Sequence, residues 1–218
     1  RRRYFQGREL DSVMNYPWKE AVISFLRDGN TGRFAGRIGE IISNYPPEVV
    51  SCLMNCLGTH DSARIMTALA GSDISGMTRE DKAYVILDEE ERRRGVRLLK
   101  MAVVLQMLLP GVPCVYYGDE TGLEGADDPF NRKPYPWGKE DTELLGFYRS
   151  LGSLRASDRR FFADSAFNML RVGDGYLGFE RSLDGESIVC FENRSDSDVW
   201  FEVSASWDII LDGGNEEI

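Results

Sequence analysis

The sequence of 218 residues has little of several residue types, and each shortage excludes a class of protein. It has a single histidine and four cysteines without a Cys-x-x-Cys pair, which argues against a zinc site. Basic residues are outnumbered, 26 Lys and Arg against 36 Asp and Glu, and the net charge of −10 argues against nucleic acid as a partner. The longest apolar run, residues 101–117, is interrupted by polar residues and prolines and is shorter than the roughly 20 residues of a membrane span.

The residues that are present describe an ordinary globular protein. Hydrophobic residues make up 42% and charged residues 28% of the chain, a balance that supports a buried core. The cysteines lie in hydrophobic surroundings, so we expect buried free thiols and, with them, a cytoplasmic location. The chain begins on Arg1 without a Met and ends soon after a strand-like stretch. We therefore expect it to be part of a longer protein, and the missing start leaves an export signal undecided.

Helical and strand patterns alternate up to about residue 158. Because parallel strands need long crossovers that are usually helices, short apolar strands followed by helices predict an α/β fold with parallel strands. Beyond residue 158, short apolar runs separated by Gly-Asp, Asp-Gly and Ser-Asp turns predict an antiparallel β-sandwich. We thus expect one domain over residues 1–158 and a second, truncated one over residues 159–218. The expected strands are 10–15, 52–57, 113–117, 168–172, 176–181, 187–193, 199–203 and 208–211, and the expected helices are 17–27, 33–44, a short turn after Pro46, 89–109 and 142–156.

The candidate functional residues lie where the predicted parallel strands end, because loops at the carboxyl ends of such strands carry function. His60 and Asp61 directly follow the strand over residues 52–57, and His60 is the only histidine. A structural alternative is that Asp61 merely caps the next helix. After the strand over residues 113–117 come Asp119 and Glu120, which as sequence neighbours point apart and are expected to be structural.

The long loop that follows holds Asp128 and Arg132 around Pro129. Long loops with prolines tend to be functional. A charge pair reaching into a cleft and a salt bridge bracing the loop both remain open for these two residues.

Three stretches of the chain carry a family resemblance: VMNYPWKEAVISFL, NCLGTHDSAR and GVPCVYYGDETGLEGADDPFNRKPYPW. Their order resembles the α-amylase family of glycoside hydrolases, most closely the neopullulanase, cyclomaltodextrinase and maltogenic amylase branch. The resemblance implies the last three βα units, strands 6 to 8, of a TIM (β/α)8 barrel followed by a β-sandwich domain. The implied activity is retaining hydrolysis of α-1,4 and, in some members, α-1,6 bonds in starch, maltodextrin, cyclodextrin or pullulan.

The resemblance also implies roles for individual residues. Asp61 matches the carboxylate that stabilises the transition state, and His60 matches the histidine that hydrogen-bonds sugar hydroxyls. Asp128 and Arg132 match loop residues that contact the non-reducing side of a bound glucan. Two positions vary within the family: Thr59 replaces the Asn of classical α-amylases, as in the branch named above, and Asn131 stands where that branch often has Cys.

Retaining hydrolysis also needs a nucleophilic carboxylate and an acid about 5 Å apart. The family carries these after its fourth and fifth strands, and the sequence has no Gly-x-Arg-x-Asp motif in their place. We therefore expect the isolated chain to be inactive, and we expect the missing half or self-association to complete the barrel. No metal or other cofactor is assigned to these residues, while calcium stays an open question for the longer protein. An α-glucan transglycosylase of the same family and a non-catalytic glucan-binding or interaction module remain as alternatives.

Overall fold

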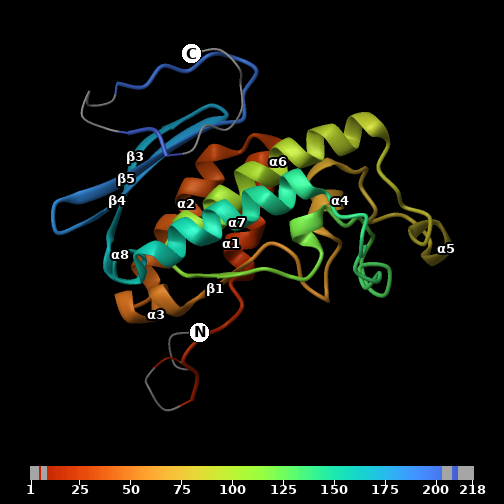
Figure 1. Cartoon of the computed structure of the whole chain (residues 1–218), viewed down its shortest axis with the longest axis horizontal. Helices are drawn as coiled ribbons and strands as arrows, with labels where there is room; N and C mark the ends of the chain where they lie inside the picture. The colour runs from red at the N-terminus through yellow and green to blue at the C-terminus, as the bar shows by residue number, and fades with distance from the viewer. Residues whose placement is uncertain (1–4, 6–8, 203–207, 211–218) are drawn as a thin grey trace.

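The computed structural model describes residue 5, residues 9–202 and residues 208–210. Its first part is a layer of helices beside short parallel strands, and its last part is an antiparallel sheet lying across one end of that layer (Figure 1). In chain order the elements are α1 (Tyr16–Asp28), α2 (Thr31–Asn44), α3 (Pro47–Cys52), β1 (Met54–Cys56), α4 (Ile65–Ala70), α5 (Arg79–Lys82), α6 (Glu89–Leu108), β2 (Val112–Cys114), the 3-10 helix η2 (Asp119–Thr121), α7 (Thr142–Ser157), α8 (Arg159–Asp164), β3 (Ala166–Gly173), β4 (Tyr176–Leu183) and β5 (Glu186–Asn193).

The parallel arrangement predicted for the first part is confirmed. β1 pairs in parallel with β2, and Met14 makes a single parallel bridge to Met54 on the other side of β1. The strand expected over residues 10–15 is thus reduced to this bridge, because within it only residues 13–15 hydrogen-bond to β1, at Met54. The other two strands are also shorter than predicted, since Cys52 ends α3 and the chain leaves β2 after Cys114.

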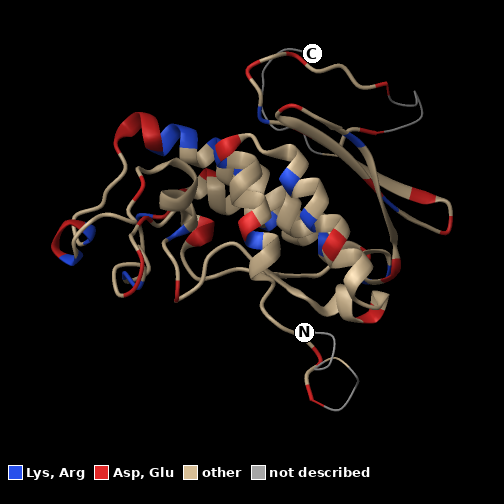
Figure 2. Cartoon of the chain, turned by 180° about the vertical axis from the view of Figure 1, so that it is seen from behind, with Lys and Arg blue, Asp and Glu red and all other residues tan. Residues whose placement is uncertain are grey.

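Local sequence signals explain where the long helices begin and end. Pro17 lies in the first turn of α1. Gly29 adopts the left-handed conformation, with φ of 72°, and its amide caps the end of the helix. Asp88 and Glu91 form a capping box at the start of α6. Figure 2 shows the acidic and then basic first turns of α6, whose later turns are buried. The short helices α4 and α5 were not predicted, because four to six residues carry too little periodicity.

The last part contains one antiparallel sheet with the strand order β3-β4-β5, which confirms three of the five strands expected there. A helix, α8, precedes it, so the expectation of strands alone beyond residue 158 was wrong; Asp158 caps this helix through the amide of Phe161. Residues 199–202 and 208–210 are not in strands, and Val203 and Leu211 lie outside the described residues. Beyond residue 158 the described residues form one three-stranded sheet, so the sandwich stays a prediction.

One hydrophobic core joins the helices to the sheet. It contains Trp18 and Phe25 of α1, the apolar face of α6, and Leu177 and Phe179 of β4. Arg181 of β4 is also buried there and donates to the carbonyls of Leu108, Phe162 and Ser165. These bonds satisfy a carbonyl at the end of α6 that the helix itself leaves without a partner. The sheet is thus packed and hydrogen-bonded onto the helical layer.

The cysteines are free thiols, as expected, but they are not all buried. Cys56 and Cys190 are buried, Cys114 is half-buried and Cys52 is exposed at the end of α3. None of the helices in the described part of the chain combines the length and the apolarity that a membrane crossing requires. Within the same residues, His, Cys, Asp and Glu side chains do not gather in threes as they would around a metal ion.

Candidate active site

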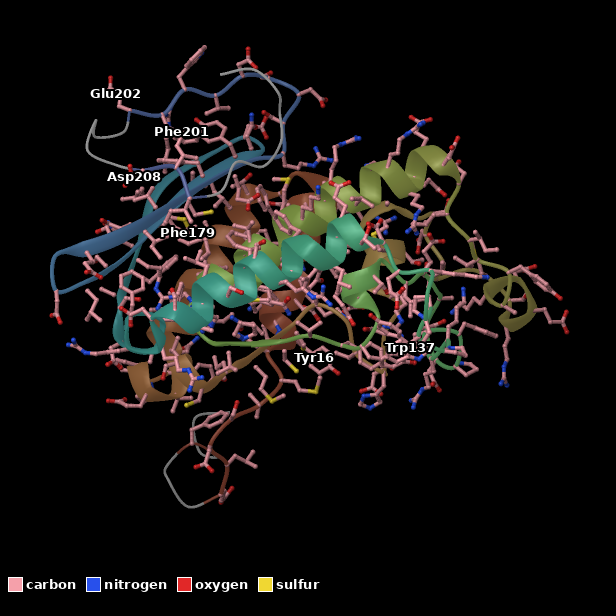
Figure 3. All side chains as sticks on the ribbon, viewed as in Figure 1. Tyr16, Trp137, Phe179, Phe201, Glu202 and Asp208 are labelled. Atoms are coloured by element: carbon pink, nitrogen blue, oxygen red, sulfur yellow. The ribbon has the colours of Figure 1, made fainter. Side chains whose placement is uncertain are left out.

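The structure places His60 and Asp61 together in the loop that follows β1. Nε2 of His60 lies 3.1 Å from Oδ1 of Asp61, and the two side chains are 53% and 61% exposed. The hydroxyl of Tyr16, at the start of α1, donates to the other carboxylate oxygen of Asp61 at 3.3 Å. Figure 3 shows Tyr16 on this strand side of the helical layer. An exposed carboxylate held between a histidine and a tyrosine is well placed to bind a polar ligand.

Asp61 does not cap the next helix, so the structural alternative is wrong. Helix α4 begins only at Ile65, and its N-cap residue is Arg64 without a side-chain cap. The amide of Asp61 itself donates to Oγ1 of Thr59, a bond within the loop that fixes the backbone where Asp61 projects. Its carboxylate is therefore available for a role other than helix capping.

The second loop, after β2, meets the first around Asn131. This side chain is fully buried, and its amide nitrogen donates to the carbonyls of Thr59, His60 and Ser62 at 3.3, 2.9 and 2.8 Å. Three backbone acceptors on one amide hold the His60–Asp61 loop tightly to the loop that carries Asp128. This role of Asn131 was not predicted, because a loop asparagine has many local uses.

Asp128 and Arg132 form the predicted charge pair next to His60. Nε of Arg132 lies 2.5 Å from Oδ1 of Asp128, and Nη2 of Arg132 donates to the carbonyl of His60 at 3.3 Å. The loop-bracing salt bridge is thus confirmed, and the side chains are 56% and 49% exposed. The pair braces the loop and also faces solvent beside the His60–Asp61 pair.

Beneath these loops lies a buried ion pair between Arg64 and Asp119. Nη1 of Arg64 lies 3.3 Å from Oδ1 of Asp119, and the guanidinium also donates to the carbonyls of Tyr117 and Asn131. It stacks over the rings of Tyr116 and Tyr117 at 4.4 and 4.5 Å. Burial raises the pKa of Asp119 to about 7, although Arg64 favours the charged form.

This arrangement explains why Asp119 is structural, as the sequence indicated. It also explains Gly58, since a Cβ there would lie 2.1 Å from Oδ2 of Asp119. Arg64 is the last residue of the stretch NCLGTHDSAR, but its partners could not be predicted from that stretch, because they are more than fifty residues away in the chain.

Comparisons with known proteins identify relatives of this chain. Amylopullulanase from Thermoanaerobacter thermohydrosulfuricus is 33% identical over 197 residues, which cover 83% of this chain and 12% of that protein. Cyclomaltodextrinase from Thermoanaerobacter pseudethanolicus is 30% identical over 214 residues, 95% of this chain and 33% of that protein. Among solved structures, the maltogenic amylase from S. marinus superposes with a TM-score of 0.73 at 30% identity, covering 92% of this chain and 26% of that one.

The chain spans at most a third of the length of these relatives. The family description that matches is "Alpha amylase, catalytic domain", and it matches residues 1–158, which include both loops of the site. The resemblance read from the three sequence stretches is confirmed, and the chain belongs to the α-amylase family.

Proposed function

We propose that this chain is the part of a retaining α-glucan hydrolase that stabilises the transition state and binds the sugar. The observation that carries the proposal is the exposed His60–Asp61 pair at the carboxyl end of β1, held in place by buried Asn131. In retaining hydrolysis the sugar ring becomes positively charged in the transition state. A carboxylate whose bonds to the sugar hydroxyls strengthen as that charge develops lowers the barrier by preorganised electrostatics.

Each residue of the site has a place in this reaction. Asp61 accepts hydrogen bonds from sugar hydroxyls beside the scissile bond, and His60 binds a neighbouring hydroxyl. The family resemblance assigns Asp128 and Arg132 to contacts with the glucan on its non-reducing side, and their exposure next to the carbonyl of His60 is compatible with that role. No resident cofactor takes part in these roles. The α-1,4 bond is the proposed target, with α-1,6 bonds as a second one.

We further propose that the nucleophile and the general acid come from outside these 218 residues. The parallel strands then correspond to strands 6 to 8 of a (β/α)8 barrel. In support, β2 pairs only with β1 among the described residues. Val112 on β2 is 46% exposed, and Val115 and Tyr117 just after it are 41% and 40% exposed. An open edge with apolar side chains is what the rest of a barrel, or a second copy, would cover. Free thiols support a reducing compartment for the protein.

The experiment that tests this proposal is complementation. The purified 218-residue chain is expected to release no reducing sugar from maltodextrin, and addition of the preceding segment of its reading frame is expected to restore release. Because the products are analysed for longer oligosaccharides as well as glucose and maltose, the assay separates hydrolysis from transglycosylation. Turnover by the chain alone that disappears in Asp61→Ala would contradict the division of roles, and no turnover after complementation would favour a non-catalytic module.

Replacing Arg132 by Met is expected to raise KM for maltodextrins about tenfold while kcat changes less than threefold. The reason is that Arg132 contacts the glucan away from the scissile bond, so its loss weakens ground-state and transition-state binding alike. Steady-state kinetics of the complemented protein with maltotriose and longer maltodextrins measures both constants. Arg160→Met is the matched control, because Arg160 also forms an exposed pair, with Asp184, in another part of the chain. A fall in kcat without a change in KM would place Arg132 at the reacting bond instead.

A further inference from the structure

The site has a buried lysine beneath it that the proposed reaction does not yet use. Lys19 lies in α1 and is only 5% exposed, although lysine is among the residues least often fully buried. Its ammonium donates to Oγ of Ser62, the residue that follows Asp61. A buried charge is retained at a cost in desolvation, so the contacts that it makes are informative about its role.

The surroundings of Lys19 come from three other parts of the fold. Asp61 in the loop after β1, Asp119 in η2, Cys56 in β1 and Glu20 on its own helix all act on it electrostatically. Burial lowers the pKa of Lys19, while these acids favour its charged form. Burial also raises the pKa of the Cys56 thiol, and the ammonium makes its direct contact through the hydrogen bond to Ser62.

A short chain of hydrogen bonds links the ammonium to the backbone of Asp61. Oγ of Ser62, which accepts from Lys19, lies 3.0 Å from Oγ1 of Thr59. Oγ1 of Thr59 in turn accepts from the amide of Asp61 at 3.3 Å. Asn131, in the loop after β2, donates hydrogen bonds to the same loop after β1 that carries Asp61. The turn that presents Asp61 is thus fixed from the helix side by Lys19 and from the loop side by Asn131.

We propose that Lys19 is a positioning residue for the hydrolysis: through Ser62 and Thr59 it fixes the turn that presents Asp61 to the sugar. This inference rests on the proposed function. It adds to the site a residue, Lys19, that acts on Asp61 without touching the substrate. Fixing a catalytic carboxylate in advance matters because a displacement of about 1 Å at the reacting bond costs about a hundredfold in rate.

The kinetic test compares Lys19→Met with the wild type in the hydrolytically competent protein. We expect kcat to fall by about tenfold to a hundredfold, with a smaller change in KM, because the geometry of Asp61 matters most in the transition state. Lys100→Met is the matched control, since Lys100 pairs with Glu143 at the surface, and its kcat should stay unchanged. Ser62→Ala removes the acceptor but leaves the lysine, and it should lower kcat in the same direction.

The pH profile separates positioning from simple packing. Because the positioning charge is lost when Lys19 deprotonates, the alkaline limb of kcat/KM in the wild type should depend on this residue. Arginine stays protonated throughout the alkaline range in which lysine loses its charge. The alkaline limb of Lys19→Arg should therefore move to higher pH, and its kcat should exceed that of Lys19→Met. A purely structural lysine would change the melting temperature of the variants without moving that limb.

Two further measurements decide the remaining outcomes. In the Asp61→Asn background, Lys19→Met should cost little more, because the two residues act as a unit. In the 218-residue chain alone, hydrogen exchange at the Asp61 amide should be faster in Lys19→Met than in Lys100→Met. An active wild type with unchanged kcat in Lys19→Met and Ser62→Ala would overturn the role of Lys19 alone. A wild type without turnover would overturn the proposed function and this role together, whatever the exchange data show.

Discussion

Replacing Asp61 by Asn is expected to lower kcat for maltodextrin hydrolysis by about 10³-fold, with a much smaller change in KM. Asparagine keeps the shape of the side chain and still accepts a hydrogen bond from Tyr16, whose hydroxyl lies 3.3 Å from the carboxylate. It lacks the negative charge that opposes the positive charge of the sugar ring in the transition state. Steady-state kinetics of the complemented protein, with active protein checked by its melting temperature, measures the effect.

The matched control for this substitution is Asp164→Asn, at the exposed end of α8. This variant should retain the wild-type kcat, because Asp164 belongs to α8 and not to either loop of the site. If instead Asp61→Asn raised KM strongly and left kcat within about threefold, Asp61 would be a ground-state binding residue, and transition-state stabilisation would have to come from another group.

The site residues that directly follow a strand could be predicted from the sequence. His60 and Asp61 follow β1 directly, and the loop after β2 comes to the same edge because the two strands are parallel neighbours. Parallel strands bring their carboxyl ends together whatever the lengths of the connections, so this meeting is predictable from order alone. The charge pair of Asp128 and Arg132 was predictable as a pair because it spans one turn of a single loop.

The supports beneath the site were not predictable in the same way. Lys19 and Asn131 act on the His60–Asp61 loop across 43 and about 70 residues of chain, and neither lies in a pattern that names a partner. The helix α8 was missed because strand-like turns dominate the sequence after residue 158, whereas the cap at Asp158 and the burial of Phe161 and Phe162 decide the local structure. Contacts between distant segments depend on packing that a local pattern does not contain.

Replacing Arg64 by Met is expected to lower the free energy of unfolding by about 3–5 kcal/mol at pH 7, because it takes the buried donor from the carbonyls of Tyr117 and Asn131 and the cation from Asp119. Both side chains are almost fully buried, at 0% and 1% exposure. Urea-induced unfolding followed by circular dichroism measures the change. The control Arg160→Met breaks an exposed pair of 70% and 65% exposure, and it should cost less than about 1 kcal/mol. Equal losses in the two variants would mean that the buried pair adds no more than a surface pair.

The pH dependence of this loss identifies its cause. Burial raises the pKa of Asp119 to about 7, above its ordinary value of 3.8, so the folded protein binds more protons at this carboxyl between those pH values. The contribution of Asp119 to stability therefore falls as the pH rises through that window. Arg64 opposes the rise in pKa, and without it ionisation costs more. The deficit of Arg64→Met should be smaller at pH 5, where Asp119 is protonated, than at pH 8, and Asp119→Asn in the same background should remove this difference. A deficit that is the same at both pH values would assign the loss to the hydrogen bonds of Arg64 with the carbonyls of Tyr117 and Asn131, because those bonds do not titrate.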